Sequence, residues 1–280
     1  MQRSDLRQRL KQGEIVIGTM VQEVRTPAIA QILKQVGFDF LMLDMEHGAY
    51  TLETAAEIIR VARLVGIAPL VRVAGPQYEL IGRILDQGAL GVMLPRVECR
   101  AQVELLVQSL KYPPQGKRGM SSDAPHSGYD FRPLAEFIAI NNEDTIAIAQ
   151  IERKAAIDDI DNILSVPGLD VALVGPEDLS VSLGLGGTDA PARVQAAIEA
   201  MIAAAARQGV VSAIHMADVE ALQAWLARGM GCVMYSSDLG FLMGDPSRGG
   251  LERLRAGIRP ATLAPVPGQA RAGGAGGAGD

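Results

Sequence analysis

Short hydrophobic runs alternate along the chain with longer segments in which apolar residues recur at helical spacing. The runs contain few polar positions, which is typical of parallel strands buried on both faces of a sheet. We therefore predict strands at residues 15–20, 40–43, 68–73, 91–94, 145–151, 171–174, 211–214 and 232–235.

Glycine follows several of the helical segments, for example Gly37 and Gly66, as C-terminal helix caps require. Repeated strand–helix units over about 250 residues predict a single α/β domain with the (β/α)8 TIM-barrel fold. An open doubly wound sheet is the alternative, but no GxGxxG motif follows the first run, which weakens its dinucleotide-binding version. The predicted helices cover residues 27–36, 52–65, 78–87, 100–110, 155–164, 192–207 and 218–227.

Two segments interrupt the alternation. Residues 112–130 are rich in Pro, Gly and Ser, so we expect a long loop there, and such loops in compact domains are often functional or disordered. Residues 260–280 are of low complexity and cannot bury a core, which predicts a disordered tail. The expected organisation is therefore a barrel domain over residues 1–259 followed by this tail.

Composition narrows the class of protein. The net charge of −6 argues against nucleic-acid binding, because phosphate contacts need clustered Lys and Arg. No apolar run reaches the roughly 18 residues of a membrane helix, and the polar N-terminus lacks a signal-peptide core. Cys99 and Cys232 lie in unrelated segments without metal-type spacing. We expect a soluble, cytoplasmic protein that binds neither nucleic acid nor membrane.

Polar residues gather where the predicted strands end. The carboxyl ends of barrel strands carry the active site in TIM-barrel enzymes, so these residues should share one rim. The second strand is followed by two carboxylates and an imidazole, and burying such charges without partners is unfavourable by several kcal/mol, which favours a role in chemistry. The residues at strand ends are Asp44, Glu46, His47, Arg72, Gln150, Glu152, Gly175, Pro176, Glu177, Asp178, Ser236, Ser237 and Asp238.

Glu152 and Asp178 are the best candidates for metal ligands. Two carboxylates from neighbouring strands suit a hard divalent cation such as Mg²⁺ or Mn²⁺. A helix cap for Asp178 and a surface ion pair for Glu152 are the structural alternatives.

Arg72 interrupts an apolar run and needs a carboxylate partner if it is buried. It is either one half of a salt bridge to Glu46 or Asp44, or a clamp for negative charge in a transition state. His47 has an intrinsic pKa suited to proton transfer near neutral pH.

Three further features are weaker candidates. His126 lies in the long loop and is expected to be solvated or to line an entrance. His215 follows the seventh strand and could reach the rim. Residues 175–178 begin a helix whose free N–H groups could bind a carboxylate, although an ordinary strand-to-helix turn is the favoured explanation of this motif by itself.

Taken together, these segments resemble the HpcH/HpaI-type class II pyruvate aldolases of the phosphoenolpyruvate/pyruvate barrel superfamily. The resemblance covers about residues 5–258, in the expected order. The matching motifs are FDFLMLDMEHG (38–48), PLVRV (69–73), ILDQGALGVMLPRV (84–97), YPPQGKRG (112–119), AQIER (149–153) and GLDVALVGPEDLSVSLG (168–184).

This resemblance implies an enzyme that reversibly cleaves a 4-hydroxy-2-oxo acid to pyruvate and an aldehyde with a divalent cation, Mg²⁺, Mn²⁺ or Co²⁺. It also implies a homotrimer or homohexamer with an exchanged C-terminal helix, for which residues 238–257 are the candidate. The implied roles are metal binding by Glu152 and Asp178, proton transfer by His47, support of its basicity by Asp86, enolate stabilisation by Arg72, and pyruvate binding by Gln150 and the backbone of Glu177 and Asp178.

Two departures from the family pattern leave the distal half of the substrate open. Gly48 stands where members that cleave dicarboxylates often have Ala followed by Pro, and Glu177 replaces a frequent small residue.

Three rival functions stay open. A Schiff-base aldolase needs a reactive lysine, for which Lys154 is the nearby candidate. A synthase could use a metal-stabilised enolate to form a carbon–carbon bond, as in a citrate synthase-like condensation of oxaloacetate with acetyl-CoA. A noncatalytic binding protein is disfavoured by the complete set of candidate residues.

Overall fold

The structure, a computed structural model, describes residues 4–130, 132–184 and 190–244. In this part of the chain, parallel strands close into a barrel in sequence order, with β8 paired to β1. This arrangement confirms the predicted (β/α)8 fold. The strands are β1 (Val16–Val21), β2 (Phe40–Asp44), β3 (Ala68–Arg72), β4 (Gly91–Leu94), β5 (Ile146–Ile151), β6 (Val171–Val174), β7 (Val211–Met216) and β8 (Cys232–Ser237).

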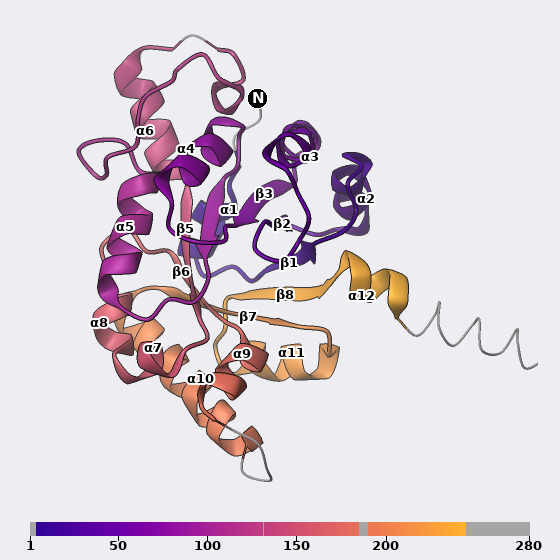
Figure 1. The fold of residues 1–280 in the computed structure, drawn as a ribbon, viewed down its shortest axis with the longest axis vertical. Helices are drawn as coiled ribbons and strands as arrows, with labels where there is room; N and C mark the ends of the chain where they lie inside the picture. Colours follow the sequence, from indigo (N-terminus) through magenta and orange to yellow (C-terminus); the bar gives the residue numbers. More distant parts are fainter. Residues whose placement is uncertain (1–3, 131, 185–189, 245–280) are drawn as a thin grey trace, which may run out of the picture. The chain divides into compact units, whose positions relative to one another are not determined.

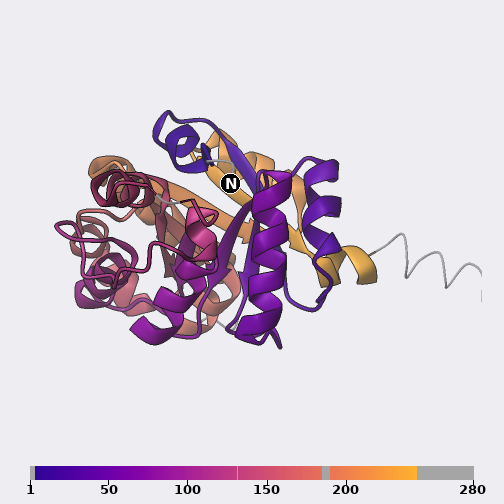
Figure 2. The same cartoon turned by 90° about the horizontal axis from the view of Figure 1, so that it is seen from above.

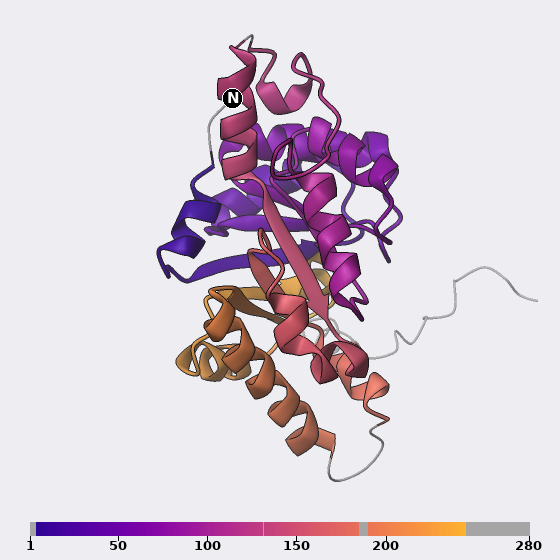
Figure 3. The same cartoon turned by 90° about the vertical axis from the view of Figure 1, so that its left-hand side faces the viewer.

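Helices surround the strands and join them (Figure 1). Helices α2 and α3 stand side by side on the outside in two views (Figures 1 and 2), and the long α10 runs diagonally in the third (Figure 3). The helices are α1 (Leu6–Lys11), α2 (Ala28–Val36), α3 (Leu52–Val65), α4 (Tyr78–Asp86), α5 (Arg100–Leu110), η1 (Pro125–Ser127), α6 (Leu134–Asp144), α7 (Lys154–Asp158), α8 (Ile160–Leu164), α9 (Pro176–Ser182), α10 (Ala190–Gln208), α11 (Val219–Ala227) and α12 (Asp238–Met243).

The structure differs from the sequence-based prediction mainly in which short helices it contains. The helix expected at residues 155–164 is split into α7 and α8, because Asp159 leaves the helical conformation with φ −120° and ψ 27°. The prediction also missed α1 and α6, whereas α9 begins where a helix was expected to start at residues 175–178, and α12 lies within the candidate helical segment 238–257. The compact barrel unit ends at Leu242, and the predicted boundary at residue 259 and the tail 260–280 lie outside the described residues. Among the described residues, no helix is long and apolar enough to span a membrane.

Two separate sets of apolar side chains form the core, one inside the barrel and one between the strands and the helices. Inside the barrel, Gly18 makes room for Phe40, since a Cβ at position 18 would lie 2.2 Å from the Phe40 ring. Leu6 and Leu10 of α1 pack against this interior set. The interior set includes Val16, Met20, Phe40, Met42, Leu70, Met93, Ile148, Leu173, Ala213 and Met234.

Alternation along the strands makes the next interior layer polar. Side chains two positions apart on a strand point to the same face, so the residues that follow Met42, Leu70, Ile148 and Ala213 by two positions also face inward. The carboxyl end of the barrel interior therefore carries charged and hydrogen-bonding groups, next to the interior set of apolar side chains. These residues are Asp44 on β2, Arg72 on β3, Gln150 on β5 and His215 on β7.

Asp238, at the end of β8, fixes the loop that leaves β1. Its carboxylate is buried and accepts hydrogen bonds from the backbone N–H groups of Gln22, Glu23 and Val24 at 2.8–3.0 Å. Because β1 and β8 are the strands that close the barrel, this carboxylate joins the first and last units of the fold.

We predict that Asp238→Ala lowers the free energy of unfolding by about 2–4 kcal/mol, because it removes a charged acceptor from three backbone amides. Urea denaturation followed by circular dichroism measures the change. The matched control is Asp161→Ala, which removes an exposed carboxylate paired with Arg207 and should cost at most about 1 kcal/mol. Equal effects of the two substitutions would contradict the role assigned to Asp238.

Candidate active site at the carboxyl ends of the strands

A cavity of about 650 Å³ opens at the carboxyl ends of the strands. It collects nine of the strand-end residues named from the sequence, which lie up to 190 positions apart in the chain. Those nine are His47, Arg72, Gln150, Gly175, Pro176, Glu177, Asp178, Ser236 and Ser237; Met20, Gln22, Met93, Leu173, His215 and Asp218 also line the cavity.

Arg72 and Asp44 form a buried, two-point ion pair at the base of this cavity. Arg72 Nε and Nη2 donate to the two carboxylate oxygens of Asp44 at 2.8 and 2.6 Å. Burial alone would raise the pKa of Asp44, but the hydrogen bonds and charge of Arg72 outweigh it and hold that pKa below its ordinary value. Of the partners considered for Arg72, Asp44 is therefore the main one.

Asp44 also shapes the turn that follows β2. Its Oδ1 accepts hydrogen bonds from the backbone N–H groups of Glu46 and His47 at 3.0 and 3.2 Å. This turn brings the buried Glu46 carboxylate to 3.5 Å from Arg72 Nε and to 3.8 Å from His47 Nε2. The His47 side chain itself is 64% exposed and lines the cavity, so proton exchange with a bound molecule or with water is sterically open.

Glu152 is held in one orientation by its neighbours. Its Oε1 accepts the backbone N–H of Arg96 at 2.7 Å, and its Oε2 accepts Gln150 Nε2 at 2.5 Å. Gly175 faces this pair, and a Cβ there would lie 2.7 Å from Glu152 Oε2. The glycine thus keeps the space beside the carboxylate open.

The electrostatics around Glu152 favour a bound cation. Burial raises the pKa of Glu152, and the carboxylates of Asp178 and Glu46 raise it further, although the Arg96 N–H and the charge of Arg72 oppose them. Asp178 stands in the first turn of α9, whose N-cap is Gly175, so Asp178 is not the cap. Within the described ranges, no cluster of three or more His, Cys, Asp or Glu side chains is placed to hold a metal ion. Glu152 and Asp178 offer carboxylate oxygens, the donor type that Mg²⁺ prefers, and Mg²⁺ often takes only one or two protein carboxylates.

The structure does not bring Asp86 to His47 within one chain. Asp86 ends α4, and its Oδ1 is 2.7 Å from Arg118 Nη2 in the long loop. No hydrogen bond or ion pair between described residues joins Asp86 to His47. The role of Asp86 therefore stays a prediction from the family resemblance.

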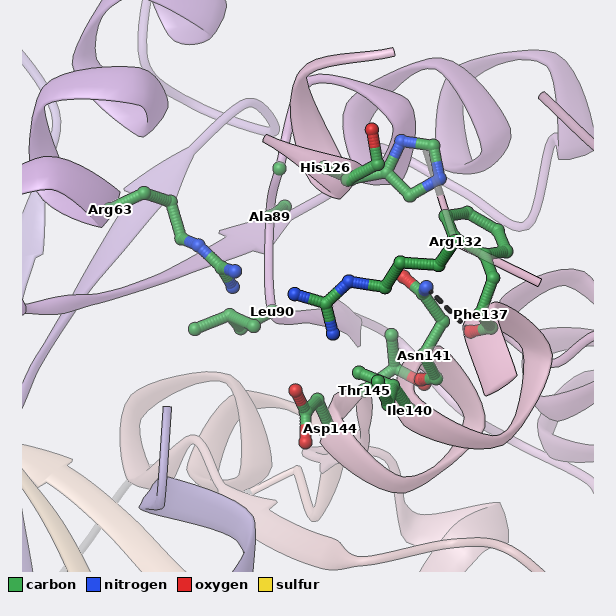
Figure 4. A pocket seen from close by; sticks show the side chains of 12 residues that line it. Arg63, Ala89, Leu90, His126, Arg132, Phe137, Ile140, Asn141, Asp144 and Thr145 are labelled. Carbon is green, nitrogen blue, oxygen red and sulfur yellow. Dashed lines mark hydrogen bonds between the residues drawn. The ribbon is translucent and has the colours of Figure 1, made fainter. Parts of the chain in front are cut away.

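His126 lies in a different hollow, at the amino ends of β4 and β5 (Figure 4). It is packed against Phe137, with its Nε2 3.2 Å from Tyr112 Oη, and burial lowers its pKa to about 4. Figure 4 shows Arg63 and Arg132 pointing into the same hollow. His126 is thus neither solvated nor at the entrance of the rim cavity.

Sequence reasoning missed one contributor and undervalued two others. Arg96 adopts a left-handed conformation with φ 53°, which no spacing rule reveals, and its Nε lies 3.1 Å from Glu46. Glu46 was noticed only as part of a cluster. His215 was named only as a weak candidate, and the structure places its side chain in the lining of the cavity.

The chain is similar to known proteins in sequence and in fold. A sequence model of the family described as HpcH/HpaI aldolase/citrate lyase matches residues 20–244. The chain belongs to this family. Membership identifies it as an enzyme, a carbon–carbon lyase.

Two curated relatives are aldolases. The chain is 35% identical over 215 residues to 5-keto-4-deoxy-D-glucarate aldolase of Escherichia coli (strain K12), covering 76% of this chain and 83% of that protein. It is 33% identical over 202 residues to a 4-hydroxy-4-methyl-2-oxoglutarate aldolase of Hapsidospora irregularis, covering 70% and 74%.

Two solved structures share the fold over nearly the whole barrel. The HpcH/HpaI aldolase from Desulfitobacterium hafniense has a TM-score of 0.88 at 32% identity, covering 92% of this chain and all of that one. Citrate synthase SbnG has a TM-score of 0.80 at 29% identity, covering 90% and 98%.

We predict that Asp44→Asn lowers the free energy of unfolding at pH 7 by about 3–5 kcal/mol, because Arg72 then stays buried without its charged partner. Since the folded-state pKa of Asp44 lies below its ordinary value of 3.8, its contribution is present above that value and is lost as the pH falls through the lower folded-state pKa. The difference in the free energy of unfolding between wild type and variant should therefore become smaller in strong acid.

Urea titrations at pH 7 and at successively lower pH measure this difference. Asp158→Asn is the control, because it removes the charge of an exposed partner of Lys154. A difference for Asp44→Asn that stays constant down to the lowest pH would contradict the assignment.

Proposed function

We propose that the protein is a class II aldolase that reversibly cleaves a 4-hydroxy-2-oxo acid to pyruvate and an aldehyde. The observation that carries the proposal is that His47, Arg72 and Asp178 line one cavity, with Glu152 hydrogen-bonded to Gln150 of that lining, in a member of an aldolase family. Mg²⁺, Mn²⁺ and Co²⁺ are the proposed cations. Held by Glu152 and Asp178, such an ion would act as a Lewis acid on the 2-oxo group.

The side chains of the cavity support the remaining steps. In cleavage, the C4 hydroxyl proton passes to the His47 imidazole, C4 becomes the aldehyde carbonyl, and the C3–C4 electron pair remains on the pyruvate part as an enolate. Arg72 is suited to balance that charge, because Asp44 occupies Nε and Nη2 while Nη1 has no partner among the described residues and is not buried. Return of a proton to C3 completes pyruvate.

Binding of the pyruvate unit is assigned to Gln150 and to the first turn of α9. Gln150 Oε1 is buried without a hydrogen-bond partner among the described residues, which leaves an acceptor for a group that enters the cavity. The backbone N–H groups of Glu177 and Asp178 are proposed to contact the pyruvate carboxylate. These assignments follow the family resemblance and the lining of the cavity.

Oligomerisation is part of the proposal. We propose a homotrimer or homohexamer, in which residues 238–257 form the exchanged segment; those beyond residue 244 lie outside the described part of the chain. Light scattering that shows a monomer would remove this element of the proposal.

A Schiff-base mechanism finds little support in the described lysines. Lys154 is exposed, and its ammonium group lies 2.5 Å from Asp158. Burial lowers the pKa of Lys111 to about 8, but its Nζ donates to Asn142 and Thr145 at the amino end of β5, away from the cavity. Absence of borohydride trapping with pyruvate is the expected result.

We predict that Glu152→Gln and Asp178→Asn each lower kcat/KM for cleavage at least about a hundredfold, because each removes a charged cation ligand. Pyruvate release is measured by coupling to lactate dehydrogenase. Binding of Mn²⁺, followed by electron paramagnetic resonance of the free ion, should weaken in both variants without substrate. Chelation should inactivate the wild type, and added Mn²⁺ should restore it.

Glu199→Gln, on the exposed face of α10, is the control for both assays. Full, chelator-resistant activity in either ligand variant would end the metal-dependent scheme.

Condensation is the second candidate, favoured by the similarity to citrate synthase SbnG. In this reading, the same cavity would join an enolate to another electrophile, as in a condensation of oxaloacetate with acetyl-CoA. Release of free CoA thiol from these two compounds, with no pyruvate released from 4-hydroxy-2-oxo acids, would select the synthase. We expect the opposite pattern.

A further inference from the structure

His215 belongs to the same polar interior layer as Arg72 and Gln150. It follows Ala213 by two positions on β7, and Ala213 lies in the apolar interior of the barrel. Its side chain lines the rim cavity. The proposed mechanism leaves this histidine without a role, although it lines the same cavity as His47, Arg72 and Gln150.

The hydrogen bond to Ser236 fixes the tautomer of His215. Nε2 lies 2.9 Å from the backbone oxygen of Ser236, and a carbonyl oxygen can only accept, so Nε2 carries the proton. Burial lowers the pKa of His215, and Arg72 lowers it further, against the opposing effects of the Ser236 bond, Glu177 and Asp44. The ring is therefore neutral at pH 7, and Nδ1 is an acceptor.

Nδ1 of His215 is open to the cavity. No described residue donates to it, and it is not among the buried polar atoms that lack a partner. A fixed, neutral acceptor that faces a cavity is suited to receive a hydroxyl proton from a bound molecule.

The charges that line the cavity indicate that the part of the substrate near His215 is uncharged. Arg72 is the one cationic side chain among the described residues of the lining, and Asp44 already binds it on the β3 side. Across the rest of the lining stand Glu177, Asp178 and Asp218. Near β8, Ser237 Oγ accepts the N–H of Gly240 at 3.0 Å and keeps its own proton to donate. Because Asp178 is assigned to the cation, Glu177 and Asp218 are the carboxylates that a second carboxylate on the substrate would meet here.

We propose that His215 contacts the substrate and accepts a hydrogen bond from a hydroxyl group of its aldehyde-derived half, which is an uncharged hydroxylated chain. The inference rests on the proposed aldolase function. It narrows the substrate class from any 4-hydroxy-2-oxo acid to those whose distal half carries a hydroxyl group and no carboxylate.

Wild-type enzyme with Mn²⁺ provides the first test. Exchange of the pyruvate methyl protons in D₂O, followed by NMR, tests the aldolase function alone. Aldol addition to pyruvate is then measured with three two-carbon aldehydes: glycolaldehyde, acetaldehyde and glyoxylate. We expect glycolaldehyde to exceed acetaldehyde in kcat/KM at least tenfold, and glyoxylate to have a higher KM than glycolaldehyde.

The variants His215→Phe and His215→Asn separate a substrate contact from a structural role. Phe removes both ring nitrogens, and the glycolaldehyde-to-acetaldehyde ratio of kcat/KM should fall at least tenfold. Asn loses the bond to Ser236 but places an amide oxygen near the site of Nδ1, so its ratio should stay within about threefold of wild type. Dividing by the acetaldehyde rate removes general loss of activity from the comparison.

His126→Phe, in the hollow at the amino ends, is the matched control and should keep the wild-type ratio. Thermal melts establish that each variant is folded, and His215→Leu, which also lacks an acceptor, takes the place of the Phe variant if that variant is not. Absence of pyruvate exchange overturns the aldolase function and the inference with it. Exchange accompanied by an unchanged ratio in the Phe variant, a collapsed ratio in the Asn variant, or a lower KM for glyoxylate overturns the inference alone.

Discussion

The site depends on the buried ion pair between Asp44 and Arg72. Asp44 is fully buried and receives two hydrogen bonds from Arg72, one from Gln22 and two from the backbone that follows β2. A charge in the barrel interior is tolerated only when its partners are this complete. Because the same carboxylate fixes the guanidinium and folds the next turn, the positions of Glu46 and His47 follow from it.

Charge balance explains why this rim suits a divalent cation. Four carboxylates, those of Asp44, Glu46, Glu152 and Asp178, face two guanidinium groups, those of Arg72 and Arg96. Two negative charges remain uncompensated in this cluster, and the charge of the exposed Asp178 raises the pKa of the buried Glu152. A divalent cation held by Glu152 and Asp178 would neutralise that excess.

The barrel and most of its rim were predictable because they rest on local patterns. Continuous apolar runs identified the buried parallel strands, and the residues after them identified Arg72, Gln150 and Glu152. The backbone N–H of Arg96 could not be found in this way, since its use depends on a left-handed φ and not on a side-chain type. The position of Asp86 beside Arg118 likewise depends on how the long loop folds over α4, which residue spacing does not encode.

A comparison of the two ends of the barrel shows which polar groups are available for chemistry. Lys111, at the amino end, donates hydrogen bonds to Asn142 and to two oxygens of Thr145, so its ammonium group is fully engaged despite its lowered pKa. Arg72 and His215, at the carboxyl end, are each anchored through some of their nitrogens and retain another that faces the cavity. Because these hydrogen bonds already order the side chain, no entropy is lost in ordering it when a substrate binds. The remaining nitrogen is then available to contact the substrate. Burial and a shifted pKa alone therefore do not distinguish a functional group from a structural one in this fold.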